Sequence, residues 1–297
     1  MKHGVINVDK PQGKTSHDIV AAVRRIIGSK KVGHTGTLDP LATGVLPILI
    51  GEATRLSEYL LESDKAYRAE IDFGYMTDTL DITGTVTARV EDFDITPAQF
   101  EECLAAFRGK IMQTPPAYSA LKHQGKPLYK YAREGRPVIK EAREVTIYEL
   151  KVLKLQLPQR ASLYVRCSKG TYIRSLIDDI GKMLGCGAVM RALCRVQSGA
   201  FTLNSAVQLD ELTAENYAAC LIQMTDAVAH LPRVAIDEAD VKRIQNGQRI
   251  TASAECADGA LALLGPKGLA AIGRFDLETN TILPKKVFRQ SYESDNS

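Results

Sequence analysis

The sequence predicts a mixed α/β protein that ends in a small β-rich module. Over the first 231 residues, short apolar or alternating runs typical of strands are interleaved with stretches of helical periodicity. Tyr67, Ala69, Ile71 and Phe73 alternate as in a strand with one buried face. From Pro232 onwards the pattern changes to short strands and turns. We therefore expect one domain at residues 1–231, a β-rich domain at 232–292 and a polar tail at 293–297.

The predicted strands are bounded by glycine, proline or polar turn residues. They span residues 4–8, 45–50, 67–73, 85–90, 145–157, 161–167, 189–193 and 195–201. Strands 145–157 and 161–167 are separated by Pro158-Gln159-Arg160, which predicts a hairpin. In the C-terminal module, turn residues at 246–247, 265–268 and 276–280 predict short strands joined by turns.

The predicted helices carry apolar residues at helical spacing, and two of them have clear end signals. Ser16 is a good N-cap for the first helix, and Gly28 is suited to close it. Thr96-Pro97-Ala98-Gln99 forms a capping box with proline at the first helical position. The predicted helices span residues 16–28, 52–62, 96–109, 127–134, about 171–185, and 209–224.

Composition is that of an ordinary globular protein. Of the 297 residues, 45% are hydrophobic and 25% are charged. No apolar run approaches the roughly 18 to 20 residues of a membrane span, and the N-terminus shows no secretory leader. We therefore expect a cytoplasmic protein without a membrane partner.

The six cysteines form no C-x-x-C pair, and the five histidines do not cluster with them. This spacing argues against a zinc site and against a disulfide framework, so we expect no metal. The cysteines are instead expected to be reduced core residues.

One glycine- and proline-rich segment, Val32 to Pro47, contains a single acid, Asp39. Such punctuation predicts a shaped loop, and Pro40 favours an extended conformation for Asp39. The following run at 45–50 predicts a buried strand that anchors the loop. A lone acid held in this way could serve as a nucleophile or general base. The alternative is that Asp39 only stabilises a turn.

Positive charge is unevenly placed along the chain. The net charge is +3, but the last 66 residues carry nine basic and nine acidic side chains, so the excess lies before residue 232. Basic groups gather at 24–31, at 122–136 with interleaved tyrosines, and at Arg191 and Arg195. Basic groups with aromatic rings suit an RNA surface, where rings can stack on bases. The alternative is an ordinary solvated face.

Near residue 170 a predicted strand gives way to a helix, with Tyr172 and Arg174 on its first turn. The end of a sheet is a common place for ligand contacts. Arg174 could also serve only to pair with Asp178, four residues further on.

Five segments in this order resemble the bacterial tRNA pseudouridine-55 synthases, the TruB family. They are residues 8–13, 33–47, 64–67, 119–129 and 168–174, and the resemblance extends from Gly4 to about Arg289. It implies an α+β (mixed α/β) catalytic domain with a curved, mainly antiparallel sheet flanked by helices, followed by a small PUA-like β barrel. It also implies isomerisation of uridine 55 in the T loop of tRNA, with no metal, nucleotide or redox cofactor.

The resemblance implies three catalytic residues. Asp39 matches the family's catalytic aspartate, which either attacks C1′ or removes the C2′ proton. Arg174 matches the arginine that keeps that carboxylate charged and oriented, since an adjacent cation favours the ionised form. Tyr67 matches the tyrosine that stacks on the target base and helps to remove the C5 proton.

The resemblance also assigns binding and supporting residues. Leu193 and Tyr172 match positions that wall the base pocket, and His34 matches the histidine that packs into the T loop. Lys10 and Pro11 match supports of the catalytic loop. The expected partner is the T-arm and elbow of tRNA, bound by a monomer. The segment 252–260 and the tail after Phe288 match no diagnostic pattern, which leaves the RNA contacts of the C-terminal module open.

Two other functions remain as alternatives at this stage. The chain could be a non-catalytic RNA-binding chaperone that opens the tRNA elbow, a role that could also coexist with catalysis. It could instead be a guide-dependent synthase that requires partner proteins.

Overall fold

The computed structural model describes residues 2–252 and 259–289, so the predicted polar tail at 293–297 lies outside the described residues. Its largest feature is a ten-stranded mixed sheet with the path β14-β1-β3-β12-β4-β11-β10-β7, to which β2 and β13 are added at β3 and β12. The pairs β1–β14 and β12–β3 are parallel, and the other pairs in this sheet are antiparallel. The predicted mixed α/β class is confirmed.

Most strands of the large sheet fall on predicted runs, but β2, β7 and β14 were not predicted, and a turn at 199–200 interrupts the predicted strand 195–201. The strands of this sheet are β1 (Gly4–Lys10), β2 (Val32–His34), β3 (Thr43–Ile50), β4 (Lys65–Phe73), β7 (Gly109–Gln113), β10 (Arg143–Gln156), β11 (Arg160–Cys167), β12 (Ala188–Ser198), β13 (Phe201–Thr202) and β14 (Val207–Gln208). Two small hairpins lie outside it: β5 (Tyr75–Thr77) with β6 (Val86–Arg89), and β8 (Lys122–His123) with β9 (Lys126–Pro127).

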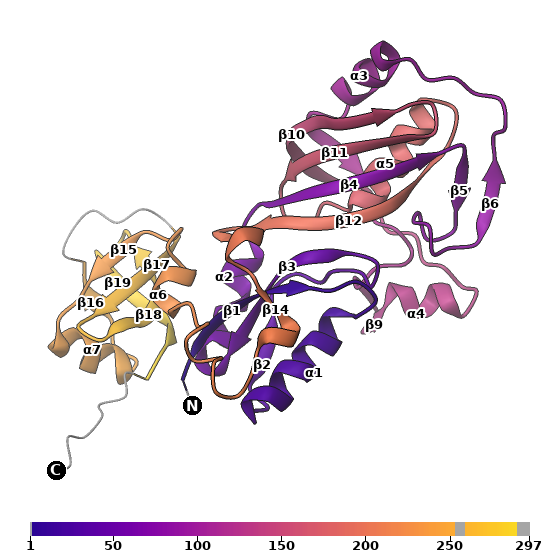
Figure 1. The fold of residues 1–297 in the computed structure, drawn as a ribbon. Helices are drawn as coiled ribbons and strands as arrows, with labels where there is room; N and C mark the ends of the chain where they lie inside the picture. The colour runs from indigo at the N-terminus through magenta and orange to yellow at the C-terminus, as the bar shows by residue number, and fades with distance from the viewer. Residues whose placement is uncertain (1, 253–258, 290–297) are drawn as a thin grey trace.

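The helices pack on both parts of this sheet. They are α1 (Ser16–Ile27), α2 (Ser57–Leu61, after a 3-10 turn at Gly51–Leu56), α3 (Pro97–Ala105), α4 (Leu128–Arg133), α5 (Ile173–Met183) and α6 (Met224–Ala227). Figure 1 shows β12 running between two groups of elements, with α3 and α5 beside β10, β11 and β4, and α1 and α2 beside β1 and β3. β12 therefore joins the two parts of the sheet.

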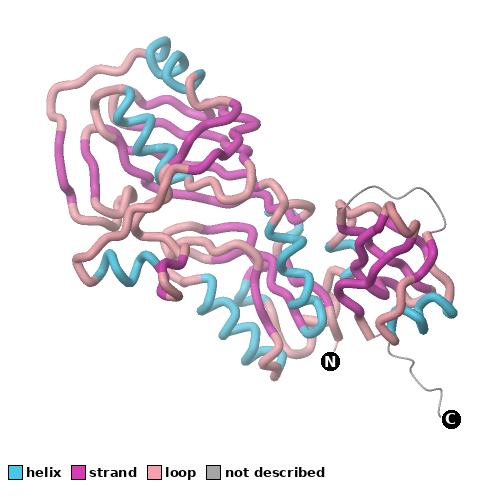
Figure 2. Tube along the Cα trace, turned by 180° about the vertical axis from the view of Figure 1, so that it is seen from behind, coloured by secondary structure: helices cyan, strands magenta, loops and turns pink. Residues whose placement is uncertain are grey.

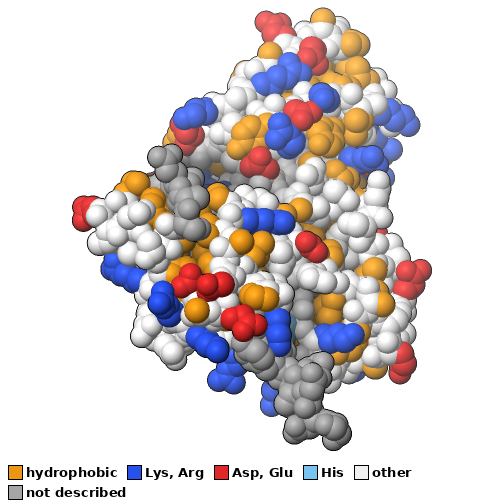
Figure 3. All heavy atoms as spheres, turned by 90° about the vertical axis from the view of Figure 1, so that its left-hand side faces the viewer, with side chains coloured by type: hydrophobic (Ala, Val, Ile, Leu, Met, Phe, Trp, Pro, Cys, Tyr) orange, Lys and Arg blue, Asp and Glu red, His pale blue; other side chains and the backbone are white. Residues whose placement is uncertain are grey.

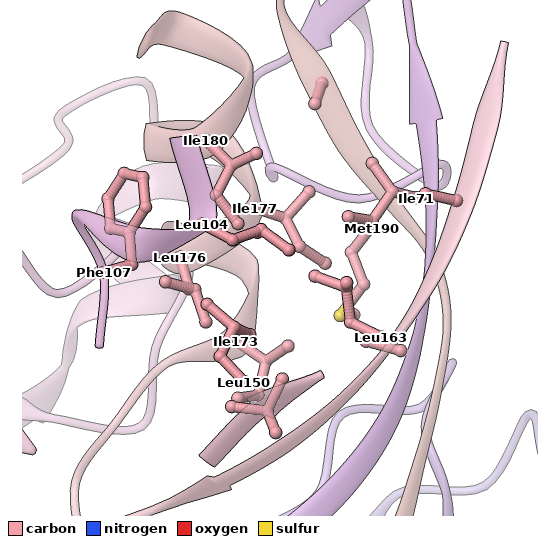
Figure 4. Packing of buried hydrophobic residues seen from close by; sticks show 14 of the residues in the cluster. Ile71, Leu104, Phe107, Leu150, Leu163, Ile173, Leu176, Ile177, Ile180 and Met190 are labelled. Carbon is pink, nitrogen blue, oxygen red and sulfur yellow. The ribbon is translucent and has the colours of Figure 1, made fainter. Parts of the chain in front are cut away.

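The larger core lies under α3 and α5. Figure 4 shows Ile173, Leu176, Ile177 and Ile180 of α5 facing the strand residues Ile71, Leu163 and Met190, with Leu104 of α3 alongside. These side chains are almost fully buried. Each Å² of apolar surface removed from water stabilises a fold by about 25 cal/mol. This cluster therefore stabilises the packing of α5 on the sheet.

The first helix begins one residue earlier than predicted. Its N-cap is Thr15, whose side chain accepts a hydrogen bond from the Asp18 backbone N–H, and Asp18 completes a capping box. Ser16, the predicted cap, is instead buried and hydrogen-bonded to Leu38. Gly28 ends the helix in the left-handed region, with φ of 63°, as predicted.

The predicted helix at 209–224 is wrong. This segment contains a 3-10 turn at Leu209–Glu211 and irregular turns, and its end is pinned by a bridge between Val5 and Ile222. The Asn216 side chain donates to the Glu211 carbonyl and accepts from the Thr213 N–H, so it competes with helical bonding. Apolar side chains here pack on the sheet face as a covering loop.

The C-terminal module is a curled five-stranded sheet in the order β15-β17-β18-β19-β16. Its strands are β15 (Arg233–Ala235), β16 (Ile250–Thr251), β17 (Ala260–Gly265), β18 (Gly268–Asp276) and β19 (Thr281–Val287). This fits the expected PUA-like barrel. One helix, α7 (Glu238–Gln245), was not expected; Asp237 caps it, and Val241 and Ile244 are buried.

The C-terminal sheet packs against the larger part of the molecule. Leu269, Ile272 and Phe288 share one buried cluster with Val5 and Leu56. Figures 1 and 2, which view the molecule from opposite sides, both place the N-terminal end of the chain near this sheet. On the side shown in Figure 3, basic and acidic side chains are interspersed, with no single basic patch. Among residues 2–252 and 259–289, no helix is long and apolar enough to cross a membrane.

Candidate active site

The Asp39 loop is held at several points along its length. Ser16 on α1 binds Leu38 twice: its hydroxyl accepts from the Leu38 N–H at 2.9 Å and donates to the Leu38 carbonyl at 3.2 Å. The Gly13 N–H donates to the Pro40 carbonyl at 2.8 Å. Asp39 thus lies between two anchored neighbours, with its side chain 36% exposed. The carboxylate faces outward from a fixed loop, which suits a reacting group.

Lys10, the last residue of β1, contacts the backbone of the Asp39 loop. Its side chain is fully buried, and its ammonium donates to the carbonyls of Ala42 at 2.6 Å, Pro11 at 3.0 Å and Pro40 at 3.4 Å. Burial lowers the pKa of Lys10 to about 8, and the negative charge of Asp39 opposes that shift. Lys10 therefore contacts the loop through the carbonyls of Pro40 and Ala42, and Pro11 contacts Lys10.

Arg174 reaches Asp39 from the first turn of α5. Its Nε lies 2.9 Å from Asp39 Oδ2, and its other two nitrogens donate to the carbonyls of Thr79 at 2.8 Å and Tyr118 at 2.7 Å. The side chain is 5% exposed. The alternative pairing of Arg174 with Asp178 is wrong, because Asp178 pairs with Lys182 at 2.6 Å.

A second acid, Asp81, lies behind Arg174 and was not predicted. Asp81 Oδ2 is 4.0 Å from Arg174 Nε, and the carboxylate is buried. It accepts hydrogen bonds from the hydroxyl of Thr79 at 2.8 Å and the N–H of Thr83 at 2.9 Å. Its sequence neighbourhood is polar and turn-rich, so nothing in the pattern separates it from an ordinary turn aspartate.

Tyr67 lies on β4 within reach of the same loop. It is 8% exposed and belongs to the apolar cluster that includes Leu38, Leu193 and Ile173. Burial raises the pKa of the Tyr67 phenol, and the charge of Asp39 raises it further, while the neighbouring Arg195 guanidinium lowers it. The structure therefore brings Asp39, Arg174 and Tyr67 together from a loop, a helix and a strand.

Leu193 and Tyr172 border this site. Leu193 is 8% exposed on β12, and its carbonyl accepts from the Thr43 hydroxyl at 3.5 Å. Tyr172 precedes α5 and is held by Gln113, whose side chain accepts from the Tyr172 N–H at 2.7 Å and donates to its carbonyl at 3.0 Å. The Arg143 guanidinium lies 5.3 Å from the centre of the Tyr172 ring. These hydrogen bonds fix the backbones of both residues.

His34 ends β2 at the start of the loop. Its ring meets His17 edge-on, with ring centres 5.4 Å apart, and its Nδ1 is buried without a hydrogen-bond partner. Burial lowers the pKa of His34 to about 4, and the charge of His17 adds to that shift. The imidazole is therefore neutral near pH 7, which suits a ring that stacks on bases.

The predicted basic groups have different environments. Between 122 and 136, Lys126 lies over the Tyr131 ring and Arg133 over the Tyr129 ring, so this segment does combine charge with aromatic surface. The suggestion that Arg195 follows a phosphate backbone is wrong, because Arg195 is 1% exposed. Its guanidinium points into the protein.

Two family models match adjoining parts of the chain. A family model described as "TruB family pseudouridylate synthase (N terminal domain)" matches residues 24–173, and one described as "tRNA pseudouridylate synthase B C-terminal domain" matches residues 174–234. The sequence is 40% identical to a tRNA pseudouridine synthase B of Yersinia pestis, covering 99% of this chain and 94% of the relative. It is 44% identical to one of Clostridium perfringens, over 84% of each chain.

A solved structure is similar as well. A chain in the structure of an H/ACA RNP bound to a substrate RNA containing 2′-deoxyuridine superposes with a TM-score of 0.74 at 28% identity, covering 96% of this chain and 85% of that one. Fold and site together define a pseudouridine synthase, an isomerase. More specifically, the chain belongs to the TruB family of pseudouridylate synthases.

Proposed function

We propose that this protein isomerises uridine 55 in the T loop of tRNA to pseudouridine. The observation that carries the proposal is the 2.9 Å ion pair between Asp39 and Arg174 beside the buried Tyr67. Relatives 40% and 44% identical to this chain bear the name tRNA pseudouridine synthase B, which supports tRNA as the substrate. We propose that the monomer is the active form.

The reaction requires the target nucleotide to leave the base stack, because neither C1′ nor C5 of a stacked uridine can reach a protein carboxylate. Flipping costs a few kcal/mol. Stacking on Tyr67 and contact with Leu193 and Tyr172 would offset part of this, at about 1–3 kcal/mol per stacked base. His34, neutral and partly buried, would occupy the space in the T loop that the flipped bases leave.

Asp39 would then start the chemistry from its ionised form, either by attacking C1′ or by removing the C2′ proton. In both routes the N1–C1′ bond breaks, the uracil turns, and a C5–C1′ bond forms. In the first route the ester bond between Asp39 and C1′ breaks as C5 attacks, and in the second Asp39 returns the proton to C2′. The C5 proton passes to a base, a role that we propose for Tyr67, and N1 ends protonated. Arg174 would hold the Asp39 carboxylate ionised and aimed at the sugar.

Replacement of Asp39 by Asn tests the proposal. Asp39→Asn should lower pseudouridine formation on an unmodified tRNA transcript by roughly a thousandfold or more, because the amide is neither a nucleophile nor a base. Binding of the tRNA should be largely retained. The matched control is Asp178→Asn, which removes an acid of α5 paired with Lys182 and should leave the rate nearly unchanged. Full turnover by Asp39→Asn would refute the assignment.

A guide-dependent synthase is the second candidate, favoured by the likeness to a chain of the H/ACA RNP. A guide-dependent enzyme needs partner proteins and a guide RNA. The purified single chain is therefore incubated with a bare T-arm stem-loop, and we expect modification at position 55. A chaperone role is tested separately by asking whether the Asp39→Asn protein still assists folding of the tRNA.

A further inference from the structure

Among residues 2–252 and 259–289, the largest fully buried side chain that the proposed chemistry does not use is that of Arg195 on β12, which is 1% exposed. β12 pairs with β4 on one side and with β3 on the other, and Arg195 lies opposite Tyr67 in the first pair and opposite Gly44 in the second. This residue therefore stands where the strand carrying Tyr67 and the strand that ends the Asp39 loop meet.

The guanidinium closes both ends of the loop. Its Nε donates to the Val45 carbonyl at 2.7 Å, and its Nη2 donates to the Gly36 carbonyl at 3.0 Å. Gly36 precedes Asp39 by three residues and Val45 follows it by six. A rigid fork with several donors can hold two carbonyls at once, whereas a lysine ammonium binds as a point.

The backbone around Arg195 leaves no room for a different arrangement. Gly44 has φ of 96°, and a Cβ there would lie 2.3 Å from the Arg195 carbonyl oxygen. Gly36 has φ of 71°, and a Cβ there would lie 3.2 Å from Arg195 Nη1. These two glycines allow the loop to close tightly around the arginine.

The third neighbour of the guanidinium is the Tyr67 phenol. Burial raises the pKa of Tyr67, and the Arg195 charge lowers it. Burial lowers the pKa of Arg195, and Tyr67 raises it. No ion pair of Arg195 with a carboxylate occurs within residues 2–252 and 259–289. Burying a cation with only carbonyls and a phenol around it is expensive compared with an apolar side chain. The burial of Arg195 is explained if its charged guanidinium is needed to hold the active-site loop.

We propose that Arg195 is a positioning residue of the isomerisation: it holds the two ends of the Asp39 loop in fixed register with the strand that carries Tyr67. The inference rests on the proposed function, since it takes Asp39 as the residue that starts the reaction.

The test compares Arg195→Lys, which keeps the charge without the fork, with Arg195→Gln, which keeps amide donors without the charge. Folding is checked by thermal unfolding and near-UV circular dichroism. RNA affinity and the single-turnover rate are measured on an unmodified T-arm stem-loop. We expect RNA affinity within about threefold of wild type and rates lowered by roughly a hundredfold or more for both variants. Arg160→Lys, which alters a half-exposed arginine paired with Asp72, is the control and should match wild type.

The split between RNA binding and rate separates positioning from simple support of the fold, because a displaced Asp39 loop slows the chemical step in a protein that still folds and still binds the RNA. A folded Arg195→Lys protein that reacts within about threefold of wild type overturns the inference. So does failure of both variants to fold, since Arg195 would then be structural. If wild type itself leaves the stem-loop unmodified, the proposed function fails instead.

Discussion

At the scale of single residues, three buried cations contact the Asp39 loop, and they bind different groups in it. Among the residues described, Arg174 is the only basic side chain within 4 Å of the Asp39 carboxylate, whereas Lys10 and Arg195 bind backbone carbonyls. Charge-assisted bonds to carbonyls offset part of the cost of burying these groups. The loop is therefore shaped by cations that do not pair with its acid, and the acid keeps one partner.

Arg174→Lys tests whether the site needs the several hydrogen-bond donors of the Arg174 guanidinium in addition to its positive charge. Lysine can pair with Asp39 but cannot also hold the carbonyls of Thr79 and Tyr118, so Asp39 loses its fixed orientation. We expect kcat to fall by roughly a hundredfold with little change in RNA affinity. The control is Arg108→Lys: Arg108 also donates two nitrogens to a carbonyl, that of Leu150, but belongs to the turn after α3. Equal losses in both variants would contradict this role.

Lys10 gives a prediction in pH. Its pKa falls from 10.5 to about 8 on folding, so between these values the unfolded chain holds a proton that the native state has released. The contribution of Lys10 to the free energy of unfolding therefore rises with pH between about 8 and 10.5. Below pH 8 the destabilisation caused by burying the charged ammonium is fully present. Relative to Lys10→Met, the wild-type unfolding free energy should gain about 1 kcal/mol between pH 7.5 and 9.

Urea unfolding of both proteins at the two pH values measures this change. Lys65→Met should show the same trend, because burial lowers the pKa of Lys65 also to about 8. A constant gap between wild type and Lys10→Met would show that the ammonium titrates at its ordinary pKa.

At the scale of elements, the start of α1 is tied to the site. Thr15 caps the helix, while its neighbour Ser16 bonds both polar groups of the Leu38 backbone. Ser16→Ala leaves a buried N–H without a partner and should cost about 1–3 kcal/mol. It should also slow modification by roughly tenfold or more, because Leu38 precedes Asp39.

Thr15→Ala is the matched control at the same helix end. Loss of the cap should cost about 1 kcal/mol of unfolding free energy. The single-turnover rate should stay near that of wild type, since within the described part of the chain the Thr15 hydroxyl hydrogen-bonds only to Asp18. If the two variants slow the reaction equally, helix stability and not the Ser16–Leu38 contact governs the loop.

Helices and strands with strong local sequence patterns could be predicted, whereas segments whose structure depends on residues far away in the sequence could not. Alternation marked β4, and the capping box at Thr96 marked α3. The segment 209–224 has helix-compatible apolar spacing, but its end is fixed by pairing of Ile222 with Val5, some two hundred residues away in sequence. α7 was missed because its eight residues are mostly polar and stop directly before the turn signal at 246–247.

The same limit applies to the site. The unusual loop around Asp39 and the strand pattern around Tyr67 could be found locally, and the resemblance to a known family linked them to Arg174. Asp81 could not be found, because its role depends on Arg174 crossing to the Thr79 carbonyl from another element. Arg195 was misread as a surface charge, since burial of a charged residue depends on strands that meet only in the fold.

At the scale of the whole molecule, the C-terminal sheet and the larger sheet share a buried cluster, which predicts that they unfold together. Phe288, 1% exposed, follows β19, and its N–H donates to the Ala270 carbonyl. The Arg55 guanidinium lies 5.3 Å from the centre of its ring and donates to the Val287 carbonyl at 2.5 Å. Lys286 pairs with Glu58 at 2.9 Å beside it.

Phe288→Ala removes the ring that lies between the two sheets and should lower the unfolding free energy by about 3–5 kcal/mol. Because the two sheets share this cluster, the variant should still melt in one transition, at a lower temperature than wild type. Leu277→Ala, at a turn position 74% exposed, is the control and should stay within about 0.5 kcal/mol of wild type. Calorimetry and urea unfolding measure both. A loss below about 1 kcal/mol for Phe288→Ala would mean that the buried cluster does not couple the sheets, and that residues 232–292 behave as an independent domain on a flexible attachment.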